Sequence, residues 1–201
     1  MKLPDKVHKS RTWRIHEIAS GFALEDVWAL PARGGPADFT QLVDTFASLD
    51  PDAGGSRPAR ALWRARWQLG RWFGWDRPAV GASALDDAET ALSHRVPEDL
   101  RHSAEELHFA SLPFSPLILT DDEMAAQISN RTVHAIVHLA WVDKGDQNYQ
   151  GQMAVYAKPH STFGAGYMLA IKPFSHWVVS PALLRQIEHG YNARLRADRT
   201  D

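Results

Sequence analysis

The sequence predicts an α+β fold in which a curved antiparallel β-sheet packs on a long C-terminal helix, with additional helices in the N-terminal half. Two observations predict it. Within residues 130–195, three dense apolar runs rich in β-branched and aromatic residues are separated by turn residues, which is typical of hairpin-connected strands. The last stretch then repeats its apolar residues at helical spacing, so one amphipathic helix follows the sheet.

Length and composition are those of an ordinary globular protein. The chain has 201 residues, of which 44% are hydrophobic and 23% charged. We expect a flexible N-terminus over residues 1–10 and a single domain over residues 11–201, with a helical and loop insertion at about 57–105.

Charge and cysteine content narrow the classes of partner and compartment. A net charge of -2 gives no general attraction to nucleic acid or to an anionic membrane. The sequence has no cysteine, which excludes disulfides, thiolate metal centres and a cysteine nucleophile and fits a reducing compartment. No segment has the length and apolarity of a signal peptide or a membrane span. We therefore expect a cytoplasmic protein without membrane insertion or nucleic-acid binding.

In the N-terminal half, a strand, a short helical segment and a helix are expected in that order. Residues 12–18 alternate between apolar and polar types, as a strand does. Residues 24–30 suggest one or two helical turns that end at Pro31. Asp38 is a suitable N-cap for the following helix. The apolar positions of that helix are Phe39, Leu42, Val43 and Phe46.

In the C-terminal half, strands are followed by the terminal helix. The expected strands are residues 107–110, 117–120, 124–129, 132–142, 149–158 and 164–172. Residues 143–148 and 159–162 form hairpin loops between them. The terminal helix covers residues 178–197, and Pro181 must lie in its first turn, which places the start near Ser180.

Two histidines on one expected strand are candidate ligand-binding groups. His134 and His138 are four residues apart, so their imidazoles point to the same face of the strand at a separation of roughly 13 Å. The pair is too far apart to share one metal ion, and Ala135 replaces the glutamate that a helical zinc-protease motif requires. Either neighbouring side chains satisfy both histidines within the sheet, or one of them contacts a ligand.

Other polar groups join the histidines as candidates. The odd-numbered residues of the strand, from Val133 to Trp141, form a wholly apolar face, and the histidines belong to the opposite, mixed face. The next two strands contribute Tyr156, Lys158, Tyr167 and Lys172. Small residues on the last strand leave room either for a ligand above the sheet or for close packing against the terminal helix.

The segment 58–73 is expected to be a long helix rich in tryptophan and arginine. Arg66 lies on its apolar side, so the guanidinium either pairs with a carboxylate in the structure or binds an anionic group in a cleft. Trp63 and Trp67 could instead form an exposed protein-binding surface. The following residues, 77–105, show no sustained period and suggest a lid or a partly disordered loop.

Familiar catalytic motifs are absent from the sequence. It has no glycine-rich phosphate loop, no nucleophile elbow and no carboxylate pair at a recognisable spacing. Asp121, Asp122 and Glu123 are contiguous, so they would not converge in a strand, and we interpret them as a polar turn. The sequence therefore predicts neither a metal site nor a cofactor.

Several segments carry a resemblance to a known family. Residues 130–134, 151–155, 170–174 and 181–184 resemble segments of a bacterial family known only as a domain of unknown function, family 2867. Residues 13–16, 24–31, 69–70 and 74–76 are similar to the same family, so the resemblance covers most of residues 11–195. These motifs imply no chemistry.

The order of elements is also similar to that of helix-grip proteins of the lipid-transfer and polyketide-cyclase kind. In those proteins a curved sheet wraps the terminal helix, and a cavity between them holds an apolar ligand. The resemblance is one of pattern, and a fold does not fix a function.

Three functions remain open. The first is binding of a small apolar or amphipathic, possibly anionic, ligand in a cavity between the sheet and the C-terminal helix. The candidate ligand-binding residues are Arg66, His134, His138, Tyr156, Lys158, Tyr167 and Lys172. The second is an enzyme of the cyclase, hydratase or isomerase type that uses His134 or His138 as acid or base. The third is protein interaction through the helix 58–73.

Overall fold

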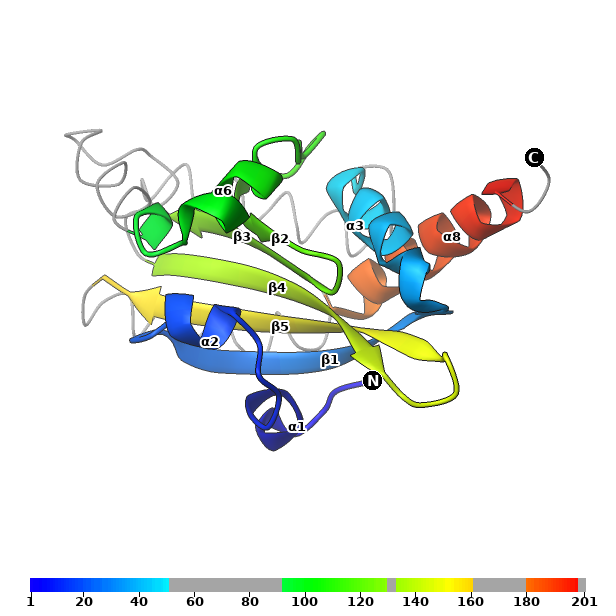
Figure 1. The fold of residues 1–201 in the computed structure, drawn as a ribbon, viewed down its shortest axis with the longest axis horizontal. Helices are drawn as coiled ribbons and strands as arrows, with labels where there is room; N and C mark the ends of the chain where they lie inside the picture. Colours follow the sequence, from blue (N-terminus) through cyan, green and yellow to red (C-terminus); the bar gives the residue numbers. More distant parts are fainter. Residues whose placement is uncertain (51–91, 130–132, 161–179, 199–201) are drawn as a thin grey trace.

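The computed structural model describes residues 1–50, 92–129, 133–160 and 180–198, and these residues confirm the α+β fold class (Figure 1). Five antiparallel strands form one curved, open sheet in the order β1-β5-β4-β3-β2. The strands are β1 (Ala23–Gly34), β2 (Ser115–Leu119), β3 (Glu123–Ser129), β4 (Val133–Asp143) and β5 (Tyr149–Pro159). Strands β2 to β5 follow one another as neighbours, and β1 pairs with the outer edge of β5.

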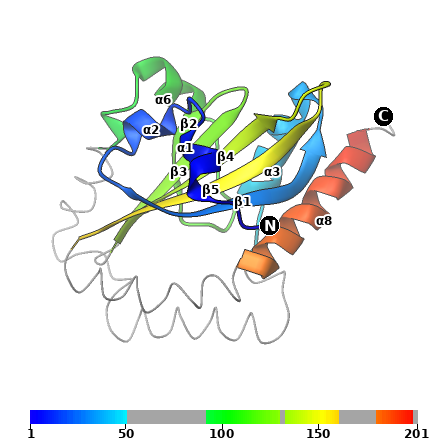
Figure 2. The same cartoon turned by 90° about the horizontal axis from the view of Figure 1, so that it is seen from below.

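Helices lie on both sides of this sheet. The described ones are α1 (Asp5–Lys9), α2 (Ile15–Ile18), the 3-10 helix η1 (Pro36–Asp38), α3 (Phe39–Ala47), α6 (Glu98–Ala104) and α8 (Ser180–Asp198). Figure 2 shows α8 on the side of the sheet away from α2 and α6. The sheet therefore has two covered faces, one under α3 and α8 and the other under the N-terminal segment.

Each face has its own apolar core, because successive residues of a strand point to opposite faces. On β4, Val137, Leu139 and Trp141 join the core that includes α3 and the α8 residues Ile187 and Tyr191. The even-numbered residues Ile136, Ala140 and Val142 join the other core, with Trp13, Ile15 and Ile18 of the N-terminal segment. The expected alternation along this strand is confirmed, and both of its faces are buried.

Helices α3 and α8 pack closely. A Cβ atom added at Gly190 of α8 would lie 2.8 Å from Cγ2 of Thr45, a contact too short for a real side chain. Thr45 is buried, and its hydroxyl donates a hydrogen bond of 2.7 Å to the Gln41 carbonyl. Glycine at position 190 therefore permits the two helix backbones to approach each other.

Several predicted elements are confirmed. Helix α3 begins directly after Asp38, and Phe39, Leu42, Val43 and Phe46 are all buried. Residues 144–148 form the loop between β4 and β5, in which Gly145, Asp146 and Gln147 adopt positive φ angles. Helix α8 begins at Ser180, as the position of Pro181 required.

Three predictions in the first half and centre of the chain are wrong. Residues 12–18 contain helix α2, and residues 24–30 belong to strand β1. The run in β1 lacked alternation because the strand is buried on both faces. Pro31 does not end it, since the proline lies in a register irregularity between Ala29 and Arg33 where the pairing with β5 is interrupted. Residues 107–110 form a loop instead of a strand.

The structure gives defined contacts to residues 1–10, which were predicted to be flexible. Lys2 pairs with Trp28 at the edge of β1, residues 5–9 form α1, and His8 is fully buried. In the predicted insertion, residues 92–105 include α6, and Leu92 and Val96 are part of a core. The helix predicted at 58–73, the strand predicted at 164–172 and residues 77–91 lie outside the described residues.

Candidate functional site

The face of the sheet under α1 and α2 carries a group of polar side chains brought together by strand register. Ala125 of β3, His138 of β4 and Ala154 of β5 lie opposite one another in one row across the sheet. Glu123 and Gln152 belong to the next row on one side, and Tyr156 belongs to the next row on the other. The methyl side chains beside His138 leave room above the sheet for residues from α1 and α2.

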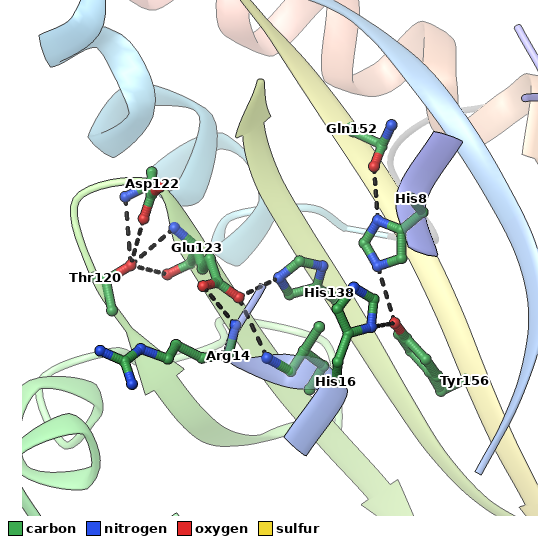
Figure 3. A network of polar contacts seen from close by, with 10 residues as sticks. His8, Arg14, His16, Thr120, Asp122, Glu123, His138, Gln152 and Tyr156 are labelled. Atoms are coloured by element: carbon green, nitrogen blue, oxygen red, sulfur yellow. Dashed lines mark hydrogen bonds and ion pairs between the residues drawn. The ribbon is translucent and has the colours of Figure 1, made fainter. Parts of the chain in front are cut away.

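Glu123 and His138 form a buried pair at the centre of this face (Figure 3). His138 Nε2 lies 3.0 Å from Glu123 Oε2, and the two side chains are 0% and 4% exposed. The backbone amides of Arg14 and Ile15 donate to the same carboxylate over 2.8 and 3.4 Å. Glu123 therefore caps the start of α2 and positions His138 at the same time.

The protonation state of the pair follows from its surroundings. Burial acts to raise the pKa of Glu123, but the hydrogen bonds from His138 and the Arg14 and Ile15 amides hold that pKa below its ordinary value. Burial lowers the pKa of His138, although the bond to Glu123 opposes this effect. Because the carboxylate only accepts, Nε2 of the neutral imidazole must carry the proton, and Nδ1 has a free lone pair.

A second chain of hydrogen bonds crosses the site beside this pair. His8 of α1 contacts Gln152 Oε1 through Nδ1 at 2.7 Å and the Tyr156 hydroxyl through Nε2 at 2.9 Å. The same hydroxyl lies 3.2 Å from Nδ1 of His16. With the amide oxygen of Gln152 facing it, His8 Nδ1 donates, the Tyr156 hydroxyl donates to His8 Nε2, and His16 Nδ1 donates to the phenolic oxygen.

Burial controls the ionisation of this chain as well. Burial and the neighbouring His138 together lower the pKa of His8 to about 4, against the opposing effect of the Gln152 hydrogen bond. Burial and the charge of Glu123 raise the pKa of Tyr156. His8 and Tyr156 are therefore uncharged near neutral pH.

Three buried polar atoms in this region make no hydrogen bond within the described part of the chain. They are Trp13 Nε1, His16 Nε2 and His138 Nδ1. Their rings pack around His8, whose ring centroid lies 6.4 Å from that of Trp13, 5.1 Å from that of His16 and 5.2 Å from that of His138. We refer to His8, Trp13, His16, Glu123, His138, Gln152 and Tyr156 together as the histidine site.

His134 lies on the same face but outside the histidine site. Its Nε2 bonds to Gln127 Oε1 at 2.9 Å, and its ring packs against Phe22 with centroids 5.0 Å apart. Burial, together with His160 and Lys158, lowers its pKa to about 4. The neighbour Gln127 thus satisfies His134, as expected for a histidine with a structural role.

The predicted site residues have different outcomes. His138 and Tyr156 come together in the histidine site, whereas Lys158 is exposed, with Nζ 6.0 Å from the Phe22 ring centroid. Strand alternation places all three on the face of the sheet opposite α8, whereas the predicted cavity lay between the sheet and that helix. Arg66, Tyr167 and Lys172 lie outside the described residues.

Sequence reasoning missed several members of the site. His8, Trp13 and His16 come from a segment with no recognisable catalytic motif, and only tertiary contacts bring them to the sheet. Glu123 was assigned to a polar turn, but it begins β3 and is 3% exposed. The sequence did contain a signal for the burial of Glu123. Glu123, Ala125 and Gln127 are two residues apart, so their side chains point to the same face of a strand.

The described residues hold neither a metal-binding cluster nor a membrane-spanning helix. No group of three or more histidine, aspartate or glutamate side chains within them is arranged to hold a metal ion. No helix within them combines the length and apolarity needed to cross a bilayer.

The fold and site define an α+β protein with a buried histidine cluster between an N-terminal segment and an antiparallel sheet. The chain belongs to the family described as "Protein of unknown function (DUF2867)", whose model matches residues 18–182. Glu123, His138, Gln152 and Tyr156 lie within the matched residues, and His8, Trp13 and His16 precede them. Comparisons with curated proteins and with solved structures found no match.

Proposed function

We propose that the histidine site binds a small uncharged molecule and that His138 acts on it as a base, in a reaction of the hydratase or isomerase type. The observation that carries this proposal is the unpaired Nδ1 of a fully buried, neutral His138 whose Nε2 is fixed by Glu123. A carboxylate behind an imidazole selects one tautomer and stabilises the imidazolium that forms when the other nitrogen takes a proton.

The hydrogen-bonding capacity of the site indicates the class of ligand. With His16 Nδ1 donating to Tyr156, a neutral His16 presents a lone pair at Nε2, as His138 does at Nδ1. Trp13 Nε1 presents an N–H group. Two acceptors and one donor match a molecule with two N–H or O–H groups and one carbonyl, such as a carboxamide. A carboxylate ligand would instead be repelled, because it would face the lone pairs of His16 and His138 close to the negative Glu123.

The proposed ligand site differs in location and polarity from the apolar cavity that the sequence predicted between the sheet and the C-terminal helix. The side chains between the described strands and α8 are large and mostly apolar, including Leu139, Trp141 and Ile187. The described polar candidates lie on the other face of the sheet. The predicted anionic ligand depended on Arg66, which lies outside the described residues, so that possibility stays a prediction.

A titration with acetamide and acetate tests the proposal. The two probes have nearly the same shape but differ in charge and in donor groups. With ¹⁵N-histidine-labelled protein, we expect acetamide to shift the Nδ1 resonance of His138 at millimolar concentrations and acetate to leave it unchanged. His138→Gln should remove binding, and the matched variant His134→Gln should retain it.

Equal shifts with acetate, or binding that survives His138→Gln, would contradict the assigned ligand class and site. Native mass spectrometry of the purified protein, followed by denaturation, would identify any natural ligand released on unfolding. The candidate reaction can then be tested on that molecule by comparing wild type with His138→Gln.

A further inference from the structure

Helix α1 is held against the sheet by one buried side chain. Of residues 5–9, only His8 is buried, at 0% exposure, whereas Lys6 and Lys9 point to solvent. A helix that buries an apolar stripe keeps its position at any pH, but α1 depends on a titratable ring.

The residues before α1 add a second attachment along β1. The Leu3 amide donates to the Val27 carbonyl and the Ala29 amide donates to the Met1 carbonyl, both over 2.8 Å. Lys2 forms an ion pair of 2.6 Å with Asp26 while its side chain remains 43% exposed. Segments with few buried apolar contacts and hydrogen bonds at an open sheet edge are the first to open locally.

The surroundings of His8 disfavour a charged ring. In the neutral ring Nδ1 donates to Gln152 and Nε2 accepts from the Tyr156 hydroxyl, whereas a protonated ring would donate from both nitrogens and the hydroxyl would have to turn to His16. The charge itself would be buried, because His8 is 0% exposed. His138 and His16 also lie beside His8, and Glu123 is the nearest carboxylate, already bonded to His138 and the α2 amides.

We propose that residues 1–12 form a proton-sensitive cover over the other residues of the histidine site, docked when His8 is neutral and released when His8 takes a proton. Release removes His8 from Gln152 and Tyr156 and opens the face that holds His138, so the inference rests on the proposed function of that face.

The direction of the pH effect follows from linkage. Docking lowers the pKa of His8 from about 6.5 to about 4, so the released state binds more protons between those values. Docking is therefore strongest above about pH 6.5 and is lost as the pH falls towards about 4. From these two values, His8 alone increases the ratio of open to docked protein by about 30-fold between pH 7.5 and pH 5.0.

Residue-resolved amide exchange of the ligand-free protein tests the cover. The Ala29 amide, which bonds to Met1, reports release of the segment, and amides in the centre of β4 report global opening. After correction for intrinsic exchange rates, we expect the protection of Ala29 to fall by about 30-fold from pH 7.5 to pH 5.0 while the β4 amides remain protected. His8→Gln, which keeps an amide to bond with Tyr156 and does not titrate, should lose most of this change, and the control His102→Gln should retain it.

A change of less than about threefold in the wild type would overturn the cover, as would an equal change in His8→Gln. If His8→Gln fails to dock even at pH 7.5, a direct NMR titration of His8 in the wild type decides, because an imidazole pKa at or above 6.5 contradicts the proposal. The two proposals fail separately. No binding of acetamide at any pH between 5.0 and 7.5, with the cover opening as expected, would reject the proposed function alone, and binding with a cover that does not open would reject the cover alone.

Discussion

At the residue scale, Glu123 links helix capping to the chemistry of the site. Its carboxylate accepts hydrogen bonds from two backbone amides of the N-terminal segment and from His138. Each donor is buried or partly buried, so none of them can replace the carboxylate with water at low cost. One side chain therefore affects both the folding of α2 and the tautomer of His138.

The variant Glu123→Gln tests this link. The amide keeps one acceptor but turns an N–H₂ group towards donors, so we expect a loss of about 2–3 kcal/mol in the free energy of unfolding. Urea denaturation measures it. The exposed neighbour Asp122 provides the control, since Asp122→Asn should change stability by less than about 0.5 kcal/mol. A similar, small effect for both variants would show that the carboxylate is not needed.

The low pKa of His134 predicts that the stability of the fold depends on pH, and this effect is separate from the histidine site. Its pKa falls from 6.5 in the unfolded chain to about 4 in the fold, so the unfolded state binds more protons between these values. The contribution of His134 is complete above about pH 6.5 and is lost as the pH falls towards about 4. The loss should reach about 2 kcal/mol between pH 7.5 and pH 5.0.

In His134→Gln, this part of the pH dependence should disappear. The measurement is the free energy of unfolding at a series of pH values, compared with His102→Gln, whose side chain is 86% exposed in the wild type. Parallel curves for the wild type and His134→Gln would contradict the low pKa.

At the element scale, the sequence predicted strands best where alternation or turn residues were clear. The loop expected at 143–148 would pair Val142 with Tyr149 and place His138 opposite Met153, whereas Asp143 belongs to β4 and pairs with Tyr149, so that His138 lies opposite Ala154. The hairpin was therefore predicted, but its register was wrong by one residue. Strand β1 could not be recognised because burial of both faces removes the alternation that distinguishes a strand. Residues 5–18 could not be placed because long-range contacts with the sheet determine where they lie.

The contact between α3 and α8 gives a prediction at this scale. Gly190→Ala improves helix propensity, but its Cβ would meet Thr45 Cγ2 at 2.8 Å. Because Thr45 is buried and hydrogen bonded, it cannot move freely, and we expect a net loss of about 1–2 kcal/mol.

Removal of Cγ2 by Thr45→Ser should reverse the effect. In that background Gly190→Ala should become neutral or stabilising, since the serine hydroxyl can still donate to Gln41. Thermal unfolding of the four proteins in the double-mutant cycle measures the coupling. Additive effects would mean that the two helices do not approach as closely as the structure indicates.

At the scale of the whole molecule, one sheet carries two cores. Ile136 and Leu139 are both 0% exposed and lie on opposite faces of β4. We expect Ile136→Ala and Leu139→Ala each to cost about 2–5 kcal/mol. Both variants should still unfold in one transition, because the two layers share the same strands.

Denaturation followed by tryptophan fluorescence and by far-ultraviolet circular dichroism tests this cooperativity, with the exposed loop variant Lys144→Ala as control. Separate transitions in Ile136→Ala would show that the N-terminal layer unfolds independently. The α+β class and the family were predictable at this scale, whereas the similarity to helix-grip proteins stays a prediction. The location of the polar site was not predictable, because alternation shows that two faces differ but not which helices cover each one.

The alternation along β4 has a consequence for evolution. Odd-numbered residues contact the core under α3 and α8, and even-numbered residues face the N-terminal segment. Mutation can therefore sample new side chains at position 138 and its neighbours on that face while the opposite core remains intact. A single strand thus allows the chemistry of one surface to diverge among descendants that inherit the same scaffold.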